Sequence, residues 1–115
     1  MRKWARLKHP LEYGDQHIYK VMVYETQANG TFVFLYNSIE SQICVEDEWY
    51  ETVTDAMDVW AELTAGESWT VVDDPLPGCQ ADCVLPIRIK GRNNGKPEWG
   101  KYEILVGETW SEYKE

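Results

Sequence analysis

The sequence predicts an α+β domain, with a mostly antiparallel sheet of about five or six strands and one main helix packed on one face. Three observations support this fold class: an Asn-Gly pair between two apolar runs, one segment with helical periodicity, and several short strand-like runs after it. The chain of 115 residues has the length of one ordinary domain. We therefore expect residues 1–115 to form a single domain, in which the N-terminal segment 1–15 is partly irregular.

The first expected element is a β-hairpin. Asn29-Gly30 lies between the apolar runs 18–24 and 31–36, and this pair favours the positive φ angles of a type I′ turn. The first run is apolar on both faces, one formed by Tyr19, Val21 and Val23 and the other by Ile18, Met22 and Tyr24. Such strands are typical of the middle of a sheet that a helix covers.

Residues 52–66 are predicted to form that helix. Apolar side chains recur at helical spacing at Val53, Ala56, Met57, Trp60 and Leu63. Thr52 or Thr54 is suited to cap the start, acidic side chains in the first turn favour the helix dipole, and Gly66 is placed as a C-terminal glycine.

The remaining strands are expected after the helix. Runs with strand composition are found at 68–72, 84–90, 102–106 and 109–113. The stretch 73–83 contains two prolines and a glycine and is expected to be a loop. Pro86 suits a strand start or an edge strand, and Gly107-Glu108 suits a type II′ turn between the last two runs.

The charge pattern is the most informative feature of this sequence. The net charge is −9, and residues 21–87 contain thirteen Asp and Glu but no Lys or Arg. A surface field of one sign repels nucleic acid and attracts basic partners. We therefore expect the partner to be another, basic protein, or a second copy of the chain in a homo-oligomer. Neither nucleic acid nor a membrane is expected.

Residues 88–101 are the exception to the acidic pattern. This segment contains Arg88, Lys90, Arg92, Lys96, Lys101 and the indole of Trp99. Basic loops with aromatic side chains stack single-stranded bases, so a nucleic-acid contact is one reading. The acidic isoelectric point of about 4.6 and the glycines and asparagines of the segment favour the other reading, the solvated tip of a hairpin between strands 84–90 and 101–106.

No motif indicates a metal, a cofactor or a catalytic centre. Cys44, Cys79 and Cys83 are odd in number and do not have the usual spacing of zinc ribbons, so we expect free thiols. The only histidines, His9 and His17, lie far in sequence from these cysteines, and no P-loop or nucleophile elbow is present. Free thiols and the absence of an apolar leader predict a soluble, cytoplasmic protein.

The densest run of carboxylates lies immediately before the predicted helix. It provides the candidate partner-binding residues Glu46, Asp47, Glu48, Trp49 and Glu51. Carboxylates would accelerate association with a basic partner and the indole would anchor it. In the alternative interpretation, Trp49 and Tyr50 pack under the helix and the carboxylates only face water.

Three stretches give the chain a resemblance to a known kind of protein. They are "YKVMVYETQANGTFVFLY", "DEWYETVTDAMDVW" and "DDPLPGCQADCVLPIRIKGRNNGKPEWGKYEIL". In the general character of these stretches, the chain resembles the small, acidic, aromatic-rich bacterial proteins encoded by mobile integron gene cassettes. It is also similar to small acidic immunity or inhibitor proteins that neutralise a basic toxin or nuclease. The resemblance implies no particular active-site residue.

We expect a non-enzymatic, acidic protein-interaction module of adaptor, immunity or inhibitor type, carried in bacteria. The alternative is an enzyme or small-ligand binder with a pocket lined by Trp and Tyr between sheet and helix. A third, weaker hypothesis is a nucleic-acid contact through residues 88–101.

Overall fold

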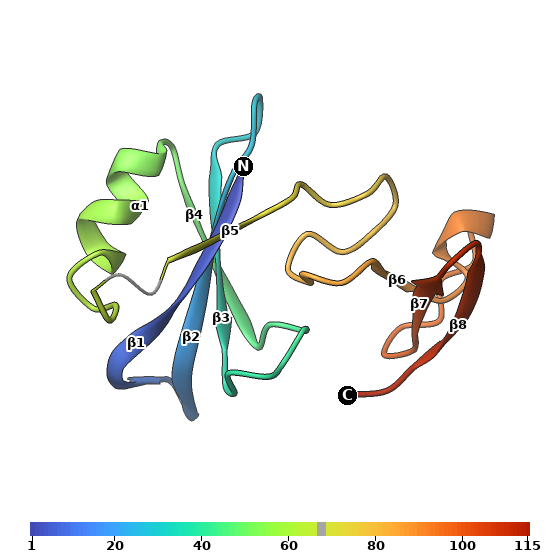
Figure 1. The fold of residues 1–115 in the computed structure, drawn as a ribbon, viewed down its shortest axis with the longest axis horizontal. Helices are drawn as coiled ribbons and strands as arrows, with labels where there is room; N and C mark the ends of the chain where they lie inside the picture. Colours follow the sequence, from blue (N-terminus) through green and yellow to red (C-terminus); the bar gives the residue numbers. More distant parts are fainter. Residues whose placement is uncertain (67–68) are drawn as a thin grey trace.

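The computed structural model describes residues 1–66 and 69–115. Within these residues the elements are β1 (Arg2–Tyr13), β2 (Gln16–Glu25), β3 (Thr31–Tyr36), β4 (Glu46–Tyr50), α1 (Val53–Trp60), β5 (Thr70–Val72), β6 (Ile87–Ile89), the short 3-10 helix Arg92–Asn94, β7 (Tyr102–Val106) and β8 (Thr109–Tyr113). Figure 1 shows α1 on one side of the sheet formed by β1–β5 and the strands β6–β8 on the other side.

The strands form two antiparallel sheets rather than one. Five of them follow the order β4-β3-β2-β1-β5, and the other three follow the order β6-β7-β8. The prediction of mostly antiparallel strands with one helix is confirmed, but that of one sheet with five or six strands is wrong. The loop 73–86 contains three prolines, which cannot donate ladder hydrogen bonds, and it separates the sheets.

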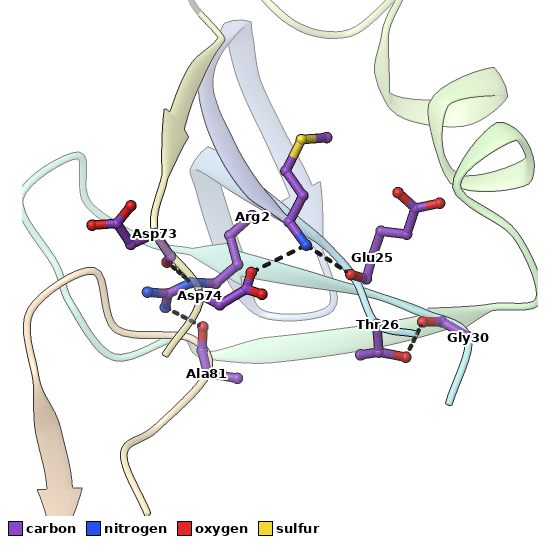
Figure 2. A network of polar contacts seen from close by, with 8 residues as sticks. Arg2, Glu25, Thr26, Gly30, Asp73, Asp74 and Ala81 are labelled. Atoms are coloured by element: carbon purple, nitrogen blue, oxygen red, sulfur yellow. Dashed lines mark hydrogen bonds and ion pairs between the residues drawn. The ribbon is translucent and has the colours of Figure 1, made fainter. Parts of the chain in front are cut away.

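The predicted hairpin is confirmed as β2 and β3, but its turn is not of type I′. Among the described residues only glycines have a positive φ, so Asn29 does not have the angle that a type I′ turn requires, whereas Gly30 has a φ of 76°. The loop is longer than two residues because Glu25 pairs with Thr31. Thr26 closes it, since its hydroxyl donates to the Gly30 carbonyl at 2.6 Å (Figure 2).

Strand β1 occupies most of the segment that was expected to be partly irregular. It pairs with β2 on one side and β5 on the other. Its register against β2 shifts between Arg6 and Leu11, and Pro10 falls in this interval, where its missing N–H removes no ladder hydrogen bond.

Helix α1 is shorter than the sequence predicted. The Thr52 hydroxyl accepts from the Asp55 backbone N–H at 3.1 Å, which confirms Thr52 as the N-cap. The helix ends at Trp60, and Thr64 then forms an antiparallel bridge with Leu7 of β1. That bridge requires extended backbone, so Leu63, a predicted core residue, lies outside the helix with 39% of its surface exposed.

The first sheet is apolar on both faces. The core on the helix side is formed by Leu7, Ile18, Val21, Val23, Val33, Leu35, Ala56 and Trp60. The opposite face buries Met22, Phe34 and Tyr36 against the chain around loop 73–86. Ile18 was expected opposite Val21 but joins it in one core, while Tyr19 is exposed; the irregular pairing of β1 with β2 begins beside these residues.

The later strands agree in part with the sequence. The predicted strand 68–72 is found as β5 from Thr70, and its first residue, Ser68, lies outside the described residues. The strand predicted for 84–90 is found only over β6, and it pairs with β7 as expected. The hairpin of β7 and β8 is confirmed. No helix within residues 1–66 or 69–115 is long and apolar enough to cross a membrane.

Candidate functional site

Strand β4 forms one edge of the five-stranded sheet. It pairs with β3 on one side, and on its other side no strand of the described chain is hydrogen-bonded to it. The backbone N–H and C=O groups along such an edge can pair with an extended segment of another chain. The candidate partner-binding residues of the sequence therefore lie on, or one residue beyond, a free sheet edge.

The side chains of β4 alternate between the two faces of the sheet. Glu46 and Glu48 are opposite Leu35 and Val33, on the side that α1 covers. Asp47 and Trp49 are opposite Phe34 and Phe32, on the other side. Glu46, Asp47 and Glu51 are exposed. An added strand would thus meet carboxylates on both of its faces.

Glu48 differs from the other acidic residues of the set. Its carboxylate accepts hydrogen bonds from the hydroxyls of Tyr13 (3.0 Å) and Tyr50 (2.7 Å) and from the indole N–H of Trp60 (3.3 Å). The hydrogen bond to Glu48 raises the pKa of Tyr13. Glu48 therefore connects β4 to β1 and α1, and it contributes less to the accessible surface than the sequence suggested.

Trp49 and Tyr50 do not pack together under the helix. Tyr50 does pack against the helix-side core, whereas 55% of the surface of Trp49 is exposed. The indole N–H of Trp49 donates to the Asn29 carbonyl at 2.7 Å. A Cβ atom at Gly30 would lie 2.6 Å from the indole Nε1, so the ring lies directly against this glycine. The indole is thus fixed on the β2–β3 hairpin with more than half of its surface open.

The basic segment 88–101 forms the connection between β6 and β7, as the hairpin reading predicted. Lys90 and Lys101 lie 4.0 and 3.6 Å from the carboxylate of Glu98. Arg88 pairs with Glu103 at 3.1 Å, and Trp99 is 74% exposed. Much of the positive charge in the segment is thus paired with the carboxylates of Glu98 and Glu103. A nucleic-acid contact stays a prediction.

Two buried cations were missed by the sequence reasoning. Arg2 is only 2% exposed and donates to the carbonyls of Asp73 (2.7 Å), Ala81 (2.9 Å) and Cys83 (2.6 Å); Figure 2 shows the first two contacts. Lys20 is 5% exposed and donates to the carbonyls of residues 39 and 41. Burial lowers the pKa of both groups. A signal was present, since Lys20 interrupts an apolar strand on the face of Met22.

The three thiols are free, and those of Cys44 and Cys79 are partly buried. Cys83 is buried, and the backbone N–H of Cys44 donates to the Asp82 carboxylate at 2.9 Å. Burial, followed by the nearby Asp82 charge, raises the pKa of both thiols. Neutral thiols are poor nucleophiles. Across residues 1–66 and 69–115, no group of three or more His, Cys, Asp or Glu side chains is placed to hold a metal ion.

The space between sheet and helix is filled by the helix-side core, including Trp60. A ligand pocket at that place, the alternative function, stays a prediction. No protein-family model, curated protein or solved structure matches this chain.

Proposed function

We propose that this chain is a non-enzymatic protein-binding module that accepts an extended, basic segment of another protein along the free edge of β4. One observation carries the proposal: a free sheet edge is flanked by the exposed carboxylates of Glu46, Asp47 and Glu51 and by the fixed, open indole of Trp49. Backbone hydrogen bonds along the edge supply affinity, and the side chains on both faces supply selectivity.

Charge supports a basic partner over a second copy of the chain. Two β4 edges that paired with each other would bring carboxylates directly opposite carboxylates, which is destabilising. Residues 21–87 contain no Lys or Arg, so no basic residue near β4 in the sequence offsets the negative charge around this edge. Such a field accelerates encounter with a cationic segment and disfavours acidic competitors.

Trp49 supports the proposal because its ring is already held in place. An indole that is fixed before binding loses little side-chain entropy when a partner covers it. The chain itself stacks cations on indoles at Lys3–Trp69 (4.9 Å) and Arg88–Trp110 (3.7 Å to the ring centroid). A Lys or Arg of the partner can make the same contact with the open surface of Trp49.

The setting that fits this activity is the bacterial cytoplasm, where the free thiols stay reduced. We propose that the chain acts as an acidic adaptor, immunity or inhibitor protein and that a mobile integron cassette encodes it.

The proposal is tested with a fluorescent peptide of about ten residues that alternates arginine and valine. Glu46→Lys with Asp47→Lys is expected to slow association at least tenfold at low salt. Asp55→Lys with Asp58→Lys, the same charge change on the exposed face of α1, is the matched control and should change the rate less than about twofold. If the two double variants slowed association equally, the effect would come from the overall negative charge of the protein and not from a site at β4.

The anchor is tested separately. Trp49→Leu is expected to weaken binding about thirtyfold, mainly through faster dissociation. Trp99→Leu removes another exposed indole and should leave the affinity unchanged. A peptide methylated on every backbone nitrogen keeps its charge but has no N–H group to donate to β4, so it cannot add a strand and should not bind. Tight binding of this methylated peptide would refute the strand-addition mode.

A further inference from the structure

A second site is indicated between loop 73–86 and the turn after β6. A cavity of about 390 Å³ is lined there by Pro77, Gly78, Cys79, Arg88, Arg92 and Asn93. The lining includes two guanidinium groups and no carboxylate, in a chain of net charge −9. This arrangement is suited to an anion.

Arg88 is oriented before any ligand arrives. Its Nε donates to Glu103 at 3.1 Å, and its guanidinium carbon lies 3.7 Å from the ring centroid of Trp110. Its side chain is only 17% exposed. Within the described part of the chain the two Nη groups have no hydrogen-bond partner, which leaves the outer side of the fork for a bidentate contact with an oxyanion.

Arg92 and Asn93 complete the donor set. The Nη1 of Arg92 donates to the Gln80 side chain at 3.2 Å, which draws Arg92 toward the loop that forms the other wall. Gly91, with a φ of 78°, precedes them, and a Cβ atom at this position would collide with the Lys96 carbonyl. The tight turn that presents Arg92 and Asn93 therefore requires a glycine.

The local charge differs from that of the whole chain. Residues 77–96 contain four basic residues and one acidic residue, Asp82. Asp82 is buried and accepts the Cys44 N–H at 2.9 Å, so it does not line the cavity. Because charges beyond about 8 Å are largely screened at physiological ionic strength, the cavity responds mainly to nearby groups. Among these, Glu103 offsets the charge of Arg88, whereas Arg92 has no ion-pair partner among the described residues.

We propose that this cavity binds the phosphate group of a small organic phosphomonoester. Two guanidinium groups and a side-chain amide match a dianion with three terminal oxygens better than a carboxylate, which has one charge and two oxygens. The volume exceeds that of a bare phosphate and leaves room for an organic group beside Pro77 and Gly78. The site is separate from the β4 edge and does not depend on the function proposed for that edge.

The test is a titration of the intact protein with phenyl phosphate, followed by calorimetry and by amide chemical shifts. The expected shifts are centred on residues 77–80 and 88–93. Arg92→Gln should weaken binding about tenfold. Lys96→Gln removes the same charge from the same turn but does not line the cavity, so it is the matched control and should weaken binding less than twofold. Arg88→Lys keeps the charge, loses the fork and should also weaken binding severalfold.

Several outcomes would overturn the proposal. They are no saturable shift at ~10 mM phenyl phosphate, equal losses in the Arg92 and Lys96 variants, and succinate that binds as tightly as phenyl phosphate. Inorganic phosphate should bind more weakly than phenyl phosphate, since it leaves the organic part of the cavity empty. A single-stranded oligonucleotide that binds when phenyl phosphate does not would replace this site with a nucleic-acid contact.

Discussion

Removal of the Arg2 side chain should detach loop 73–86 from the first sheet. Arg2 lies on the face of the sheet that carries Met22 and Tyr36, and its guanidinium reaches three carbonyls of the loop and its borders. No carboxylate lies within ion-pair distance of this guanidinium among the residues described. These backbone carbonyls therefore take the place of water around the guanidinium. Among the described residues, Arg2 is the only side chain that donates hydrogen bonds to them.

The size of the effect follows from these contacts. A hydrogen bond to a charged donor contributes about 1.5–3 kcal/mol, so the three bonds amount to several kcal/mol in gross terms. The cost of burying the guanidinium offsets part of this gain. Arg2→Met keeps the apolar stem, removes the charge and leaves three acceptors without their donor. We expect a loss of about 3 kcal/mol in the free energy of unfolding.

Urea denaturation followed by tryptophan fluorescence measures this loss. For a chain of this size, about 3 kcal/mol lowers the midpoint by roughly 2 M urea. Arg6→Met is the matched control, because Arg6 is exposed on the same strand, and it should cost less than about 0.5 kcal/mol. Arg2→Lys keeps the charge without the fork and should be intermediate. A stability of Arg2→Met within 0.5 kcal/mol of the control would refute the reasoning.

Two further predictions concern stability. Gly30→Ala should destabilise the fold by about 1–3 kcal/mol, because φ is 76° and the new methyl group meets Trp49; Trp49→Leu should restore part of this loss, as measured by urea denaturation. Above pH 9 the protein should lose stability, because burial raises the pKa of Tyr36, Cys44 and Cys83. These groups stay protonated in the folded state but ionise on unfolding, so their stabilisation is complete below about pH 8. Above its unfolded pKa, each group lowers the free energy of unfolding by up to about 1.4 kcal/mol per pH unit. The lowered pKa of Lys20 has the opposite effect on stability, but it is a single group, whereas three groups have a raised pKa. A melting temperature that rises between pH 9 and 11 would contradict the predicted net loss of stability.

The elements with local signals were predictable from the sequence. The hairpin of β2 and β3 follows from two apolar runs around Asn29-Gly30, and the start of α1 follows from the hydroxyl of Thr52. Both signals act within a few residues. The end of α1 was not predictable in the same way, because it depends on the bridge between Thr64 and a residue 57 positions earlier, Leu7.

Long-range pairing explains the other differences. Residues 2–13 are rich in basic side chains, but they form a central strand because β2 and β5 both pair with them. The acidic surface was predictable as a set, since its residues are adjacent in sequence. The inward direction of Glu48 was not, because Tyr13 and Trp60, which hold it, come from elements on either side of β4 in the chain.

Amide hydrogen exchange along β4 tests the proposed function most directly. Strand addition places new hydrogen bonds on those β4 amides that point away from β3. With the alternating arginine–valine peptide at saturation, exchange of these amides should slow at least tenfold, while the outer amides of β8, one edge strand of the second sheet, stay unchanged. Protection that appears on β8 or α1, or binding without any protection in β4, would contradict the proposal.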